Sequence, residues 1–128
     1  MRRRFRPRSS VLLAAVAVAL AVAACADRSE EPGVFEGYYY TGFETSNFVP
    51  GRSCDDRGPR YWLVSDPEAR FNEALQEAGW HPLAFQAFWV RFEGELSEPG
   101  RYGHLGAYER EVRVTKLLEL RHAPECEG

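Results

Sequence analysis

The first 24 residues determine how much of this chain is left to fold. Five arginines at positions 2–8 precede an apolar run, Val11–Ala24, that ends in small side chains. A basic start, a short apolar stretch and a small-residue exit are typical of a secretory signal peptide. The alternative, an uncleaved membrane helix, needs about 20 apolar residues, and Asp27 prevents an extension of the run. We therefore predict that residues 1–24 are removed and that one small domain remains.

The residues around the predicted cleavage point, Val22-Ala23-Ala24-Cys25, resemble the lipobox of bacterial lipoproteins. The resemblance implies that lipid, including palmitate, is attached to Cys25 and that the protein is held at a membrane of the cell envelope, facing the periplasm or the exterior. Ala26 rather than Asp follows Cys25. By the same resemblance, this favours the outer membrane if the bacterium has two membranes. The alternative is ordinary cleavage after Ala24, which leaves Cys25 as a free thiol.

The charge of the remaining chain limits its partners. Without residues 1–24, 11 Lys and Arg remain against 19 Asp and Glu, a net charge of −8. Nucleic acids and anionic headgroups repel such a domain. We predict no nucleic-acid partner, and membrane attachment through the lipid on Cys25. Residues 25–33 are predicted to be the lipidated N-terminus and a flexible tether, and residues 34–128 a single β-rich domain.

Two further cysteines, Cys54 and Cys126, predict one disulfide in an exported protein. The bond would close a loop of 72 residues, for which the loop-entropy model gives about 4 kcal/mol. The alternative is two unpaired thiols. Neither cysteine belongs to a CxxC pair, so a redox or zinc site has no support.

The first half of the domain indicates strands. The aromatic stretch Val34–Val49 predicts one long first strand. Gly37 and Gly42 within it predict bulges or sharp bends, as at the corners of small barrels. After a loop at 50–60, Tyr61–Val64 predicts a short second strand.

A helix is predicted next. Ser65 with Glu68 matches a capping box, and Asp66 precedes a proline suited to the first helical position. Gly79 is a typical left-handed residue for the helix end. Four apolar residues recur at helical spacing and predict the buried face: Phe71, Ala74, Leu75 and Ala78.

Two alternating segments, Ala87–Leu96 and Tyr108–Arg121, predict half-buried antiparallel strands. The side chains expected to point inward are Phe88, Val90, Phe92 and Leu96 in the first, and Val112, Val114, Leu118 and Leu120 in the second. Arg91 shares the other side with Glu93 and Glu95. This favours a cross-strand charge ladder over a glycosidase carboxylate pair.

The predicted fold class is therefore mainly β with one helix (α+β), in the order β-β-α-β-β. A small bent antiparallel sheet closed as an OB-like barrel fits the glycine-interrupted first strand. The alternative is a flat α+β sheet with the helix on one face.

The segment Arg101–Arg110 holds the candidate ligand-binding residues, Tyr102, His104 and Tyr108. It resembles a glycine-rich segment of bacterial lipoproteins and exported proteins, and the resemblance implies no activity. Glycines allow close backbone approach, His104 offers a donor or acceptor, and the tyrosines offer flat surfaces. The alternative is a structural turn in which Tyr108 packs on the core and His104 bonds to backbone.

No catalytic residue, metal site or cofactor is predicted. His81, His122 and the pair Asp55 and Asp56 lack the three or four converging ligands that a metal site needs. Four aromatic residues could stack on sugars or bases: Tyr38, Tyr39, Tyr40 and Trp89. Together with Trp62 they could equally fill the core or cover its rim.

These observations favour a non-catalytic binding or scaffolding module that contacts an envelope protein or a glycan. The alternative is a small hydrolase or lyase in which His104 is the base.

Overall fold

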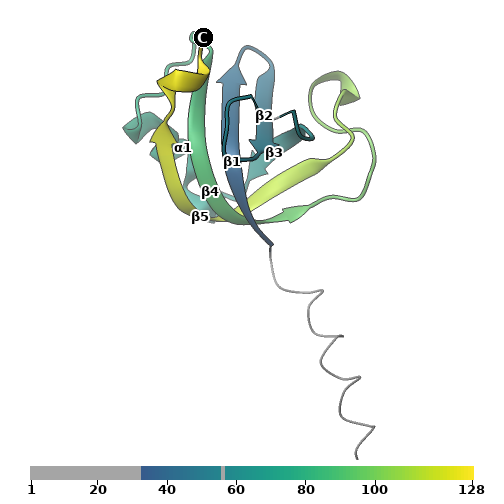
Figure 1. Cartoon of the computed structure of the whole chain (residues 1–128). Coiled ribbons are helices and arrows are strands. Elements are labelled where there is room, and N and C mark those ends of the chain that lie inside the picture. Colours follow the sequence, from purple (N-terminus) through teal and green to yellow (C-terminus); the bar gives the residue numbers. More distant parts are fainter. Residues whose placement is uncertain (1–32, 56) are drawn as a thin grey trace, which may run out of the picture. The chain divides into compact units, whose positions relative to one another are not determined.

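The computed structural model describes residues 33–55 and 57–128, and Figure 1 shows their arrangement. The predicted signal peptide, Cys25, the tether before Gly33 and Asp56 lie outside the described residues. Among the helices of the described part, none is both long enough and apolar enough to cross a bilayer.

Five strands form a closed barrel (Figure 1). They are β1 (Gly33–Gly42), β2 (Thr45–Pro50), β3 (Tyr61–Ser65), β4 (Gln86–Leu96) and β5 (Glu111–His122). The order around the barrel is β1-β2-β3-β5-β4, with β4 also paired to β1. Only the β3–β5 pair is parallel. The chain is thus mainly β, consistent with the predicted small OB-like barrel, and the flat sheet is excluded.

One α-helix and three single-turn 3-10 helices complete the described elements. The α-helix is α1 (Phe71–Glu77), and the 3-10 helices are η1 (Pro67–Ala69), η2 (His104–Gly106) and η3 (Pro124–Cys126).

The long first strand predicted over Val34–Val49 is wrong, because the chain turns back in its middle. Gly42 pairs with Thr45, so Phe43 and Glu44 form a two-residue turn between β1 and β2. Glu44 takes the left-handed conformation, with a φ of 53°. The order is therefore β-β-β-α-β-β rather than β-β-α-β-β.

The core lies inside the barrel, and β4 contributes to it as predicted. Phe88, Val90 and Phe92 are fully buried, with Phe48 and Val112 among their neighbours in the core. Period-two alternation places three consecutive inward side chains of β4 in one apolar interior. Burial of such side chains stabilises the fold by about 1.5–3 kcal/mol each.

Two inward assignments are wrong. Leu96, at the end of β4, is 37% exposed. The β4–β5 register shifts twice, which leaves Thr115 and Leu118 as extra residues of β5. Each bulge moves the following residues to the other face. As a result Leu117 packs against the core, while Leu118 is 38% exposed.

The helix is present but begins later than predicted. The capping box does not form, because η1 precedes the helix and Arg70, in the left-handed conformation, separates the two. The Asp66 carboxylate instead accepts a hydrogen bond from Arg113 on β5 at 3.2 Å. The predicted apolar face is correct, since Phe71 and Leu75 are buried in the core.

The predicted disulfide between Cys54 and Cys126 is present. It links the loop 51–60 to η3 beside a second apolar cluster, on the outer side of β1 and β4. There the ring centroids of Tyr38 and Trp89 lie 5.2 Å apart, and both side chains belong to the same cluster as Ala123. These two rings therefore pack beneath the C-terminal residues.

Candidate functional site

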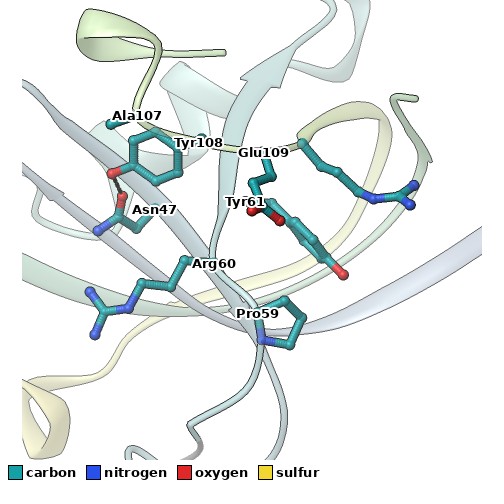
Figure 2. Close-up of a pocket in the computed structure, with 8 residues that line it drawn as sticks. Asn47, Pro59, Arg60, Tyr61, Ala107, Tyr108 and Glu109 are labelled. Atoms are coloured by element: carbon teal, nitrogen blue, oxygen red, sulfur yellow. Dashed lines mark hydrogen bonds between the residues drawn. The ribbon is translucent and has the colours of Figure 1, made fainter. Parts of the chain in front are cut away.

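A pocket of about 540 Å³ lies on the outer side of β2 and β3, at the point where the β4–β5 loop (residues 97–110) reaches these strands. Its lining comes from β2, from β3 and the residues before it, and from the end of the loop (Figure 2). The lining residues are Asn47, Pro59, Arg60, Tyr61, Ala107, Tyr108, Glu109 and Arg110.

Tyr108 joins the β4–β5 loop to the barrel. Its hydroxyl donates a hydrogen bond to Oδ1 of Asn47, as Figure 2 shows. Its ring centroid lies 5.3 Å from that of Trp62. Asn47 and Trp62 are register partners, and Phe48 beside Asn47 points into the core, so alternation places both partners on the outer face.

Gly103 allows the same loop to lie directly on Trp62. Its φ is 69°, and a Cβ at this position would stand 2.5 Å from Cδ2 of the indole ring. Glycine adopts this conformation at no steric cost and leaves room for the ring. Trp62 is therefore covered by the loop and is not an open stacking surface.

Backbone hydrogen bonds hold the β4–β5 loop as a narrow hairpin. Tyr102 and Tyr108 exchange two of them, with N···O distances of 2.9 and 3.2 Å. The Gly100 N–H donates to the carbonyl oxygen of Glu109 at 2.8 Å. The Tyr102 hydroxyl donates to the carbonyl oxygen of Glu98, also at 2.8 Å. The loop thus presents Tyr108 and its neighbours to the pocket from a fixed frame.

The lining combines both charges with flat rings. Arg60 and Glu109 are exposed, and the Arg110 guanidinium donates to the carbonyl oxygen of Ser97 at 3.1 Å. Tyr108 contributes a phenol ring, whereas Tyr61, the register partner of Phe48, packs against the core. Such groups can hydrogen-bond to hydroxyl and amide groups and contact the faces of a ring. No serine, cysteine or histidine belongs to the lining.

Of the three predicted ligand-binding residues, only Tyr108 lines the pocket. Tyr102 bonds within its own loop. His104 lies at the tip of the loop, where its Nε2 is 3.0 Å from Oε2 of Glu44 in the β1–β2 turn. Gly103 and Gly106 take a positive φ, as the structural-turn interpretation expects. Tyr108, however, packs on Trp62 outside the barrel core, and the His104 side chain contacts Glu44.

Four residues of the lining were not predicted from the sequence: Asn47, Arg60, Tyr61 and Glu109. They carry no local motif, and closure of the barrel brings them together. Asn47 and Tyr108, for example, are 61 positions apart. Only the glycine and tyrosine pattern of the β4–β5 loop indicated this region.

The other candidate ligands have structural partners. His81 Nδ1 accepts from the Leu83 N–H at 3.2 Å, and His122 Nε2 lies 2.5 Å from Oε1 of Glu127. Within residues 33–55 and 57–128, no group of three or more His, Cys, Asp or Glu could hold a metal ion.

The β4–β5 register supports the predicted charge ladder. Glu93 stands opposite Lys116, and Glu95 stands opposite Arg113. Opposite charges at facing positions stabilise a strand pair. Arg113, however, forms its ion pairs with Asp66 and Glu111, so the ladder is one of facing positions only.

Comparison with known proteins finds no match to this chain among protein-family models, curated proteins or solved structures.

Proposed function

We propose that this chain is a lipid-anchored protein of the bacterial cell envelope, and that its OB-like barrel is a non-catalytic module that binds a glycan in the Tyr108 pocket. The lipobox-like residues before Cys25 support the anchor. The Cys54–Cys126 disulfide supports an oxidising compartment outside the cytoplasm, where such bonds persist.

The pocket beside Tyr108 is the observation that carries the binding role. OB-type barrels bind oligosaccharides or oligonucleotides with the strand 2–3 face and its adjacent loops. Here the pocket lies on β2 and β3 and is bordered by the loop that follows β4. The Tyr108 ring, the Asn47 amide and the charged groups of the lining are suited to sugar hydroxyl and acetamido groups. The acidic balance disfavours an oligonucleotide.

Calorimetric titration with a soluble N-acetylglucosamine tetramer tests the pocket. Arg60→Ala and Glu109→Ala alter exposed lining residues, so the fold should persist. We expect each to weaken binding by about fivefold to tenfold, the range of one ordinary net hydrogen bond of about 1 kcal/mol at an exposed position. Arg91→Ala, at an exposed position of β4 outside the pocket, is the matched control. No heat of binding, or equal weakening by the control, would reject this site.

Labelling with radioactive palmitate tests the anchor separately. We expect the label in the wild-type chain and none in Cys25→Ser, which should also leave the membrane fraction. An unlabelled wild-type chain, or identical fractionation of the two, would remove the basis for the envelope role.

A second candidate function, a small hydrolase or lyase with His104 as base, is favoured by one contact. Glu44 lies 3.0 Å from the imidazole, and a carboxylate can orient such a base. His104→Ala separates the two functions. We expect an unchanged fold and unchanged tetramer binding, because the pair is exposed and lies outside the pocket lining. A folded variant that loses function in the cell while binding persists would favour the enzyme.

A further inference from the structure

The barrel closes between β3 and β5 over only part of the length of β5. Strand β3 pairs only with Glu111–Val114, while β4 pairs with β5 along its length as far as His122. Beyond Val114, the side of β5 away from β4 meets η1 and α1 instead of a strand. Helix and strand cannot share ladder hydrogen bonds, so the seam between them is a place where the surface can be hollowed.

Two adjoining hollows of about 320 and 330 Å³ lie along this seam. Both are lined by Ala74 and Glu77 of α1 and by Leu117 of β5. We call them together the α1–β5 groove. Alanines on the helix and leucines on the strand form a small apolar floor within a lining that is polar for the most part. The outward bulge places Leu118 there, 38% exposed.

Carboxylates line the same groove from both sides. Glu73 and Glu77 come from α1, and Glu119 comes from β5. Among residues 33–55 and 57–128, none of the three takes part in an ion pair. Two arginines lie nearby: Arg70 lines one end of the groove, and Arg91 is the register partner of Glu119. In the described part of the chain, neither arginine forms an ion pair with these carboxylates. Like charges one helical turn apart repel each other, so a cation between them would be stabilising.

We propose that the α1–β5 groove binds a short peptide segment of a partner protein in which Lys or Arg side chains alternate with leucine-like ones. The apolar floor would cover the aliphatic side chains, and the carboxylates would hold the cationic ends. A bare metal ion would leave the floor exposed, and an acidic ligand would meet three carboxylates. This proposal does not depend on the Tyr108 pocket, which lies on β2 and β3.

Fluorescence anisotropy of a labelled eight-residue peptide of alternating lysine and leucine tests the groove, with the full chain in a non-ionic detergent. We expect saturable binding that weakens with salt, because the charges are exposed. Replacing the lysines by glutamates should abolish it. The double variant Glu73→Lys and Glu77→Lys should weaken binding by about tenfold.

Two matched controls separate the groove from general attraction to an acidic domain. Asp55→Lys with Glu98→Lys makes the same charge change at exposed positions outside the groove, and we expect less than about a twofold effect. Leu118→Ser removes the most exposed leucine of the groove, and Leu96→Ser alters a leucine of matched exposure outside it, 37% against 38%. We expect only Leu118→Ser to weaken binding.

Three outcomes would overturn the proposal. They are equal weakening by both charge doubles, equal binding of the glutamate peptide, and a Leu118→Ser chain that is folded by circular dichroism and binds like wild type. A dimer of the wild-type chain in sedimentation that Leu118→Ser dissociates would assign the groove to a second copy and overturn it as well.

Discussion

The barrel carries aromatic side chains on two of its outer faces, and different covers lie over them. On β1 and β4, the rings of Tyr38 and Trp89 pack against the C-terminal cover, residues 123–128. A covalent bond links this cover to the loop 51–60. On β2 and β3, Trp62 lies beneath the β4–β5 loop. The loop is held there by the close approach of Gly103 to the indole ring and by the hydrogen bond from the Tyr108 hydroxyl to Asn47.

The difference between the covers shows where the barrel can accept a ligand. Under the C-terminal cover, Tyr38 is buried and its ring belongs to a packed apolar cluster. At the end of the β4–β5 loop, the Tyr108 ring is half-buried and borders the pocket. Beneath the disulfide-linked C-terminal cover, Tyr38 and Trp89 pack against other residues and contribute to the stability of the fold. The cover held by weaker contacts leaves an aromatic residue available for binding.

The largest expected effect comes from removing the covalent link. Changing Cys54 and Cys126 together to serine should lower the free energy of unfolding by about 4 kcal/mol, because the unfolded chain regains the freedom of a 72-residue loop. Urea unfolding followed by tryptophan fluorescence measures this difference. Reduction of the wild-type chain should reproduce it, and unchanged stability in both cases would show that the C-terminal cover does not need its disulfide.

A smaller effect is expected at the cover without a covalent link. Gly103→Ala places a Cβ against Trp62 at a φ of 69°, which should cost about 2–3 kcal/mol. Gly79→Ala is the matched control, since Gly79 also has a positive φ, 95°, but nothing lies within 4 Å of its added Cβ. We expect about 1–2 kcal/mol there from the backbone alone. Equal losses in urea unfolding would mean that the loop does not rest closely on the ring.

Much of this fold could be predicted from local pattern, and its errors have physical causes. The alternation of β4 predicted Phe88, Val90 and Phe92 correctly, because that segment runs without an extra residue of its own. The β1–β2 turn was missed because Phe43 and Glu44 are not typical turn residues. On β5, the extra residues Thr115 and Leu118 changed which side chains face inward, and strict period two cannot anticipate a bulge.

The candidate site was less predictable than the fold. Tyr108 was found because glycines and tyrosines gather around it in one segment. Asn47 and Arg60 look like ordinary residues of a strand and a loop, and only the pairing of β2 with β3 brings them to Tyr108. The covering of Trp62 by Gly103 likewise depends on a contact between segments about forty positions apart, for which no local pattern exists.

The smallest expected effect is a pH dependence at the C-terminal cover. Glu127 accepts a hydrogen bond from the Ala87 N–H at 3.0 Å and lies beside His122. The backbone hydrogen bond, followed by the one to His122, lowers the pKa of the Glu127 carboxyl in spite of partial desolvation. A lowered folded-state pKa means that the carboxylate stabilises the fold above the ordinary carboxyl pKa of about 4.3, and that this contribution is lost as pH falls further.

Glu127→Gln keeps an acceptor for the Ala87 N–H but removes the charge. At pH 7 we expect the substitution to lower the free energy of unfolding by at most about 1 kcal/mol, the range of a partly exposed ion pair. At pH 3 the two chains should converge, because the wild-type carboxylate is then losing its charge. Urea unfolding at both pH values measures this. The same difference at pH 3 and pH 7 would mean that Glu127 secures the cover through packing alone, and that only the disulfide distinguishes it from the cover over Trp62.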